Sequence, residues 1–370
     1  MTKETKEYDL RILEAFGTYG PRNLARIARE LRINAGSLRK RVKRRSFPEV
    51  FLNINVYHTN LGLRKCVVFA DAAKGNEELL YKSMKIPDYW LYLSRCYGTY
   101  EGCLGIFTIP VNKETKFKQY LRELEKSGIA NNMKSFWSTC FHTVNLTRNW
   151  FDVENKTWMF KWDGWVEEIR AKDKEPRELP LTLIDPKEYP QLADFMDVFI
   201  LKELEKDATV SFTEIGKKAG VTKQDIKYHF EKHIIQHGLI ETFQVISFPF
   251  EKAVSDFYFF TFWFDSEESM RRFAVSLLNK PFMRSIGKVF GENGLIVQLY
   301  LPRVEFREFV DRLSELCRLG LLKDYWYVIQ DWRKIERETI PYKLFTKRNW
   351  LYDHDAYLKE LGALEKAISS

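Results

Sequence analysis

The sequence carries one hydrophobic pattern twice, at an offset of about 190 residues, and this repeat restricts the folds available to the chain. The matching pairs at an offset of 188 are Asp9 with Asp197, Ile12 with Ile200, Ile33 with Val221 and Leu38 with Ile226. The matching pairs at an offset of 192 are Pro110 with Pro302, Phe117 with Phe309, Leu121 with Leu313 and Gly128 with Gly320. Because long repeats are copies of one structural unit, the sequence predicts a tandem duplication that folds as a pseudo-dimer within one chain.

The first copy opens with three short helical segments in residues 9–45. Leu13 and Phe16 share a face of the first segment, and apolar residues around Ile27 recur at helical spacing in the second. Asn34 is suited to the N-cap of the third segment because its side-chain oxygen can accept a backbone N–H. Two helices joined by a tight turn, with the second one basic, form the helix-turn-helix arrangement of DNA-binding proteins.

Positive charge is concentrated at this end of the chain. The formal net charge is +8, and the first fifty residues hold thirteen Lys and Arg against six Asp and Glu. This asymmetry favours a polyanionic partner, and the basic third helix favours double-stranded DNA read through the major groove. The residues predicted to bind DNA in the first copy are Asn34, Ala35, Gly36, Ser37, Arg39, Lys40, Arg41, Lys43, Arg44 and Arg45.

The corresponding helix of the second copy has a different charge. The residues predicted to bind DNA there are Thr222, Lys223, Gln224, Lys227 and Tyr228. Asp225 and Glu231 offset the lysines of this helix, and His229 and His233 stand where the first copy has arginines. Coulomb attraction to a phosphate backbone should therefore favour the first copy, and the second is expected to bind DNA more weakly.

After each helix-turn-helix, alternating and apolar runs predict strands and amphipathic helices in the order β-α-β-β-α-β, a ferredoxin-like unit. The strands expected in the first copy are residues 50–57, 63–71, 89–98, 102–110 and 133–143, with helices at 77–83 and 113–127. The strands expected in the second copy are 238–248, 256–265, 282–290 and 294–302. The predicted fold class is therefore α+β, with two winged helix-turn-helix units that are each followed by a ferredoxin-like unit.

This arrangement resembles the Lrp/AsnC (feast/famine) family of prokaryotic transcription regulators. The resemblance is carried by NLARIARELRINAGSLRKRV in the first copy and SFTEIGKKAGVTKQDIKYHFEKHIIQHGLIE in the second. It implies dimerisation through the ferredoxin-like units and recognition of a palindrome by two helices. The first copy departs from the family pattern because it has Arg45-Ser46-Phe47-Pro48 where the second has the Gly-Leu-Ile that begins the wing.

Charge and proline content suggest where the units begin and end. The expected divisions are a first helix-turn-helix domain at 1–48, a ferredoxin-like domain at 49–144, a Trp-rich extension and linker at 145–190, a second winged helix-turn-helix domain at 191–250, a second ferredoxin-like domain at 251–332 and a C-terminal extension at 333–370. The tryptophans of the extension could stack on a nucleobase or another ligand, but packing is the more common role of such a cluster.

Several kinds of site find little support in the sequence. The five cysteines form no CxxC pair, so neither a zinc-cysteine site nor a disulfide framework is indicated. No apolar run approaches the roughly 20 residues of a membrane span, and no signal-peptide pattern opens the chain, which predicts a cytoplasmic protein. His229, His233 and His237 share a helix face and could bind a metal, but no carboxylate partner is evident near them in the sequence. The expectation is no metal and no cofactor.

The sequence thus predicts a sequence-specific, DNA-binding transcription regulator that is not an enzyme. Its expected partners are double-stranded DNA and the transcription machinery, without a membrane, and a homodimer is an alternative to the pseudo-dimer. Two other functions remain open. Some proteins that resemble this fold are siroheme decarboxylases, in which His and Arg handle tetrapyrrole carboxylates. RNA binding would need aromatic side chains on the central strands, where Tyr258, Phe260 and Phe262 alternate.

Overall fold

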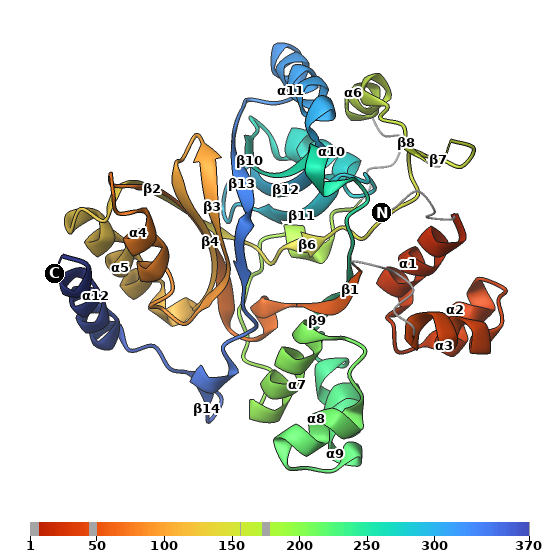
Figure 1. Cartoon of the computed structure of the whole chain (residues 1–370), viewed down its shortest axis with the longest axis horizontal. Coiled ribbons are helices and arrows are strands. Elements are labelled where there is room, and N and C mark those ends of the chain that lie inside the picture. Colours follow the sequence, from red (N-terminus) through yellow and green to blue (C-terminus); the bar gives the residue numbers. More distant parts are fainter. Residues whose placement is uncertain (1–6, 44–49, 156, 172–177, 370) are drawn as a thin grey trace.

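The computed structural model describes residues 7–43, 50–155, 157–171 and 178–369. It combines two helical units with a large curved sheet, and further helices pack on the outer face of that sheet (Figure 1). The fold is thus of the mixed α/β kind expected from the sequence.

The N-terminal helical unit folds around one apolar cluster. Its helices are α1 (Glu7–Tyr19), α2 (Leu24–Glu30) and α3 (Ala35–Lys43). Asn23 begins α2 by accepting a hydrogen bond from the N–H of Arg26. Phe16, Ile27 and Leu38 from the successive helices are fully buried together. This confirms the helical segments expected in residues 9–45, of which 44 and 45 lie outside the described residues.

The first αβ unit follows a strand that belongs to another sheet. After β1 (Phe51–Val56) and the short helix η1 (His58–Asn60), the elements are β2 (Leu63–Ala72), α4 (Glu77–Ser83), β3 (Trp90–Gly98), β4 (Gly102–Pro110), η2 (Val111–Lys113), α5 (Glu114–Lys126) and β5 (Ala130–Ser138). The strands are ordered β5-β2-β4-β3, so the fourth strand of the unit lies beside the first, and the third lies between the first and the second. Gly128, with φ of 71°, lies just beyond α5 in the left-handed region that glycine adopts readily.

The second helical unit consists of α7 (Phe195–Lys206), α8 (Phe212–Ala219), α9 (Lys223–Tyr228) and the π-helical turn η4 (His229–Ile234). Capping boxes begin α7 at Asp194, α8 at Ser211 and α9 at Thr222. Strand β9 (Ile240–Ile246) then pairs antiparallel with β1, so the strands that follow the two helical units form one ribbon.

The second αβ unit has the same strand order as the first. Its elements are η5 (Lys252–Val254), β10 (Ser255–Trp263), α10 (Glu267–Leu277), β11 (Met283–Lys288), β12 (Gly294–Pro302), α11 (Arg303–Arg318) and β13 (Asp324–Arg337). Strand β13 crosses residue 332, where the sequence suggested a domain boundary. The four strands of this second αβ unit are ordered β13-β10-β12-β11 in the sheet.

The two half-sheets join along β3 and β13. In the described part of the chain, nine strands form one sheet in the order β5-β2-β4-β3-β13-β10-β12-β11-β6. The far ends of this sheet also meet, because the N–H of Thr139 donates to the carbonyl of Lys288 at 2.9 Å and that of Phe290 donates to Trp137 at 2.8 Å. The expected strand 133–143 is therefore interrupted: β5 ends at Ser138, and β6 (His142–Thr143) pairs with β11.

Side-chain alternation gives the curved sheet two apolar faces. On β2, Cys66 and Val68 face the helices α4 and α5, whereas Val67 and Phe69 point to the opposite face. Phe69 there meets Phe259 of the other half, with ring centroids 5.9 Å apart. The inner face of the sheet is thus filled by apolar side chains from both halves.

The remaining segments pack on the outside of the molecule. They are β7 (Phe151–Asp152), β8 (Thr157–Trp158), α6 (Trp162–Arg170), η3 (Leu181–Leu183), η6 (Tyr342–Leu344), β14 (Phe345–Thr346), β15 (Asn349–Trp350) and α12 (His354–Ser369). Trp162 and Trp165 are buried against α10 and α11, and the indole N–H of Trp165 donates to Ser276 at 3.0 Å. Packing is therefore the role of these two tryptophans. No helix within the described residues has the length and apolar character needed to cross a membrane.

Candidate functional site

Helix α3 presents four of the predicted DNA-binding residues, Gly36, Ser37, Arg39 and Lys40, on its exposed surface. The side-chain oxygen of Asn34 accepts a hydrogen bond from the N–H of Ser37 at 3.1 Å, as expected of an N-cap. Leu38 is fully buried, whereas Arg39 and Lys40 are exposed. Of the other predicted positions, Gly36 and Ser37 are exposed and Ala35 is half-buried, Arg41 and Lys43 lie on the described helix backbone, and Arg44 and Arg45 fall outside the described residues.

The second candidate helix, α9, is short, and part of its positive charge is neutralised by acidic residues. Thr222, Lys223, Gln224, Lys227 and Tyr228 are all exposed, which is the orientation expected of DNA-facing residues. Lys227 forms an ion pair with Glu231 at 3.7 Å. The histidines that follow do not extend this exposed surface. His229 and His233 turn inward and contact Asp194 and Asp197, which corrects the expectation that they have no carboxylate neighbour.

The two helical units contact each other through Arg22. Its guanidinium donates to the carbonyl of Val210 and lies over the ring of Phe212, 4.4 Å from the ring centroid. Burial lowers the pKa of Arg22 to about 10, so the side chain still carries its charge at neutral pH. This contact holds the loop before α2 against the loop before α8 and fixes the two units relative to each other.

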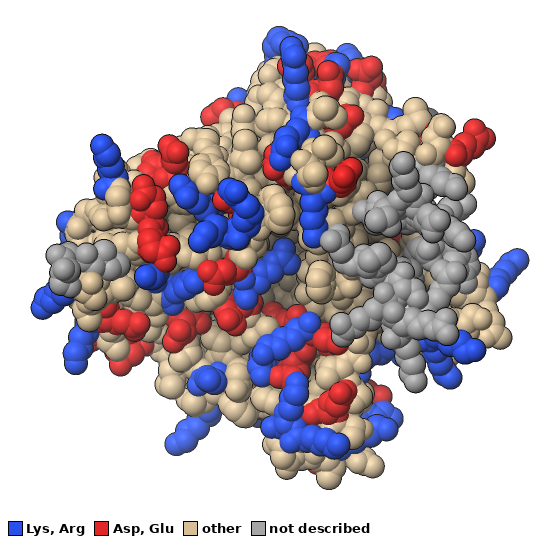
Figure 2. All heavy atoms as spheres, viewed as in Figure 1, with Lys and Arg blue, Asp and Glu red and all other residues tan. Residues whose placement is uncertain are grey.

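A pocket of about 470 Å³ lies where the β1–β9 ribbon meets the large sheet, and it was not expected from the sequence. Its lining comes from β1, α7, β9, η5, β10, β12 and β13. The lining residues are Phe51, Asn53, Lys206, Ile246, Phe248, Lys252, Ser255, Phe257, Tyr300, Trp332, Ile335 and Arg337. Figure 2 shows both basic and acidic side chains around the hollow near the middle of the face that is drawn.

The pocket combines aromatic walls with positive charge. Phe257 and Tyr300 are buried with ring centroids 4.8 Å apart, and Trp332 at the rim is 45% exposed. Lys206, Lys252 and Arg337 carry the charge, and the described lining contains no Asp or Glu. Such a combination suits a ligand that has both a broad apolar surface and several carboxylates or phosphates.

A fourth cation lies behind this pocket. Arg284 lines an adjoining cavity of about 60 Å³ that shares Phe248, Phe257 and Arg337 with the main pocket. Burial lowers the pKa of Arg284 to about 10, which leaves it positively charged at neutral pH. Its guanidinium donates to the carbonyl of Ser247, and this hydrogen bond fixes its orientation.

Comparison with known proteins gives two different relatives. No protein-family model matches the sequence. An uncharacterized HTH-type transcriptional regulator of Pyrococcus horikoshii is 25% identical over 136 residues, which make up 35% of this chain and 89% of the regulator. The crystal structure of the siroheme decarboxylase NirDL is similar over 99% of this chain and 100% of NirDL, with a TM-score of 0.55 and 10% identity.

Two further structures complete the comparison. NirDL in complex with an iron-uroporphyrin III analogue matches over 97% of this chain and 98% of NirDL, with a TM-score of 0.51 and 10% identity. E. coli AsnC matches 40% of this chain and 99% of its own length, at a TM-score of 0.30 and 18% identity. The whole described chain therefore shares the fold of NirDL.

These comparisons correct one conclusion drawn from the sequence. The basic helix favoured a protein that is not an enzyme, but the protein that matches this chain over its full length is a decarboxylase. That prediction placed too much weight on the charge of one helix, because the pocket between the two halves has no continuous sequence motif that could have revealed it.

Proposed function

We propose that this chain is an enzyme that binds a carboxylated tetrapyrrole in the central pocket and removes carboxyl groups from its side chains. The observation that carries this proposal is the aromatic pocket with Lys206, Lys252 and Arg337 around it and no acidic residue in its described lining. The full-length fold similarity to siroheme decarboxylase NirDL supports the choice of ligand class.

The chemistry of CO2 loss constrains which residues of the pocket would contact the reacting carboxylate and which would contact the other carboxylates. The bond between the carboxyl carbon and the side-chain methylene breaks, its electron pair stays on the methylene carbon, and a proton from solvent completes a methyl group. Because the negative charge of the carboxylate disappears from that group, a cation paired with it would stabilise the ground state more than the transition state. The cations are therefore assigned to the carboxylates that do not react, and the reacting carboxylate to the aromatic wall.

The position of the cations fits this assignment. Lys252 lies over the ring of Phe248, with its ammonium 4.3 Å from the ring centroid, and Arg337 lies over Tyr92 at 5.6 Å. Each cation thus lies against the face of an aromatic ring. Carboxylates at the periphery of a flat ligand would reach these groups while its face covers Phe257 and Trp332.

The test is an absorbance titration with iron-uroporphyrin III. Lys252→Gln combined with Arg337→Gln should weaken binding about ten-fold, because two partly exposed ion pairs contribute roughly 0.5–1 kcal/mol each. Arg333→Gln is the control, since Arg333 is on the same strand as Arg337 but is outside the described lining of the pocket and is paired with Asp331. Mass spectrometry of siroheme incubated with the protein should show loss of CO2. Absence of binding, or equal weakening by the control, would refute the proposal.

We also propose, as a second function, that α3 binds double-stranded DNA. This proposal is supported by the exposed Arg39 and Lys40 beside the buried Leu38 and by the similarity to an HTH-type regulator. By analogy with helix-turn-helix complexes, the residues expected nearest the base edges are Ala35, Gly36, Ser37, Arg39 and Lys40, and those expected nearest the phosphates are Arg41, Lys43, Arg44 and Arg45. With four phosphate contacts, log K should fall with log salt at a slope of about −3.6.

A mobility-shift titration at fixed salt separates the two recognition helices. Arg39→Ala combined with Lys40→Ala should cost about 1–3 kcal/mol for each lost base contact. Lys223→Ala combined with Lys227→Ala should cost less, because α9 is shorter and Lys227 is already paired. A binding affinity that hardly depends on salt would eliminate DNA as the ligand of α3. Equal losses in the two double variants would instead show that both helices bind alike.

Finally, we propose that the two halves are copies of one duplicated unit, divided at the boundaries expected from the sequence except that the second αβ unit extends through β13 to Arg337. The identical strand order of the two αβ units supports this. Superposition of residues 197–330 on residues 9–140 is the direct test.

A further inference from the structure

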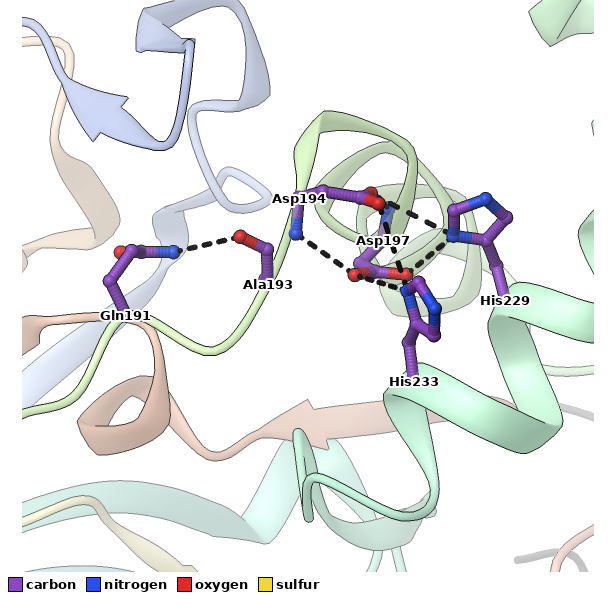
Figure 3. A network of polar contacts seen from close by, with 6 residues as sticks. All are labelled: Gln191, Ala193, Asp194, Asp197, His229 and His233. Carbon is purple, nitrogen blue, oxygen red and sulfur yellow. Dashed lines mark hydrogen bonds and ion pairs between the residues drawn. The ribbon is translucent and has the colours of Figure 1, made fainter.

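Four potential metal ligands converge inside the second helical unit (Figure 3). Asp194 and Asp197 lie at the start of α7, and His229 and His233 lie on η4. Nδ1 of His229 is 2.8 Å from Asp197 Oδ1, and Nδ1 of His233 is 3.2 Å from Asp197 Oδ2. Each Nδ1 is also 3.7 Å from an oxygen of Asp194.

These distances match the edges of a small coordination polyhedron. A tetrahedral zinc ion with bonds of about 2.0–2.2 Å holds its ligand atoms about 3.3–3.6 Å apart. The four Asp–His separations are 2.8–3.7 Å, and the candidate ligand atoms of all four residues lie within 4.8 Å of one another. Side-chain movements that shorten the longest separation would place all four groups around one ion.

The backbone that presents the histidines is unusual. In an α-helix an N–H donates to the carbonyl four residues earlier, but here the N–H of Ile235 donates to Phe230, five residues earlier, at 3.0 Å. π-Helical turns are rare and are frequent at functional sites. This turn directly follows the short helix α9 and brings both imidazoles to face α7, so the local distortion and the convergence of ligands coincide.

The carboxylates are also held in place before any ion arrives. The N–H of Asp194 donates to Asp197 Oδ2, and the N–H of Asp197 donates to Asp194 Oδ1, each at 2.9 Å. The side chain of Asp197 is fully buried, and a buried carboxylate requires compensating positive charge. A divalent cation bound to two carboxylates and two neutral imidazoles would make the cluster neutral.

We propose that Asp194, Asp197, His229 and His233 bind one divalent first-row transition metal. Zinc is the expected ion, because imidazole and carboxylate together favour it over calcium or magnesium, which prefer oxygen ligands alone. The ion would connect the first helix of the second unit to the end of α9. It would thereby stabilise the second helical unit, which lacks the strong positive charge of the first. The metal site depends neither on the proposed ligand of the pocket nor on DNA binding.

The test uses the full-length protein after removal of metals with EDTA. Isothermal titration with Zn²⁺ should show one site, and Co²⁺ should produce the visible absorption of a tetrahedral complex. His229→Gln combined with His233→Gln should weaken binding on the order of 100-fold or more. His237→Gln is the matched control: His237 follows on the same segment, is exposed, and is outside the cluster.

A second variant and a second readout separate metal binding from folding. Asp194→Asn keeps a side-chain oxygen that can accept the capping hydrogen bond, so the helix should still begin normally while zinc binding weakens. Zinc should raise the melting temperature of the parent and of His237→Gln, because a ligand that binds only the native state stabilises it. The double histidine variant should show no such rise. Absence of binding at millimolar zinc, or undiminished binding by the double variant, would overturn the proposal.

Discussion

Glu205 on α7 makes the stability of this protein depend on pH. Its side chain is half-buried, and its Oε2 accepts a hydrogen bond from the N–H of Ile340 at 2.7 Å. Burial raises the pKa of Glu205 from 4.5 to about 7, against the opposing effects of this hydrogen bond and of Lys65. Between these two values the native chain holds a proton that the unfolded chain has lost.

The sign and the size of the effect follow from this difference. The contribution of Glu205 is fully present below about pH 4.5 and declines as the pH rises through about 7, because the buried carboxyl must then ionise. The difference between the two pKa values corresponds to about 3 kcal/mol in total. Allowing for its partial exposure, we expect the free energy of unfolding to fall by about 2 kcal/mol between about pH 5 and about pH 8.5 through this group alone.

Urea unfolding at the two pH values measures this contribution. Glu205→Gln cannot ionise but can still accept the hydrogen bond from Ile340, so its stability should decline about 2 kcal/mol less than that of the parent over the same interval. Glu188→Gln, at an exposed position, serves as the control and should follow the parent. Parallel declines in the parent and in Glu205→Gln would refute the reasoning.

Four further substitutions are checked by urea unfolding, and three of them concern packing while the fourth removes buried hydrogen bonds. Phe259→Ala should cost about 3–5 kcal/mol, because the ring is fully buried on the inner face of the sheet; a loss near zero would show that this face tolerates a cavity. Gly102→Ala should destabilise by about 1–3 kcal/mol, since its Cβ would lie 2.4 Å from the carbonyl oxygen of Ala70. Gly164→Ala, in open space within α6, should instead stabilise by about 0.5–1 kcal/mol. Gln330→Leu should cost about 2–3 kcal/mol by leaving its buried hydrogen-bond partners unsatisfied, and a neutral result would contradict this.

The sequence predicts the elements that depend on local signals. The amphipathic pattern around Phe117 and the terminating Gly128 identify α5, and Thr222 with Asp225 identifies the start of α9. These features arise from residues within a few positions of each other. They could be read directly because neighbouring side chains determine a cap or a helix face.

The sites that need distant residues could not be found in this way. The repeat identifies Asp197 as the counterpart of Asp9. The contact of Asp197 with His229, however, spans 32 positions and depends on how α7 packs against η4. The pocket likewise brings Lys206 beside Arg337 through the pairing of β1 with β9 and the course of β13. Neither pairing leaves a local periodicity in the sequence.

The junction between β3 and β13 has a consequence for assembly. Its buried side chains include Gln330, which donates to Tyr92 at 2.8 Å and to Ser94 at 2.9 Å. In a symmetric dimer every interface residue occurs twice, so a single substitution changes both sides of the axis. Here one polypeptide supplies both sides, and their effective concentration is fixed by the chain rather than by the amount of protein in solution. A substitution can therefore alter one side of this junction without altering the other, and dilution cannot separate the two halves.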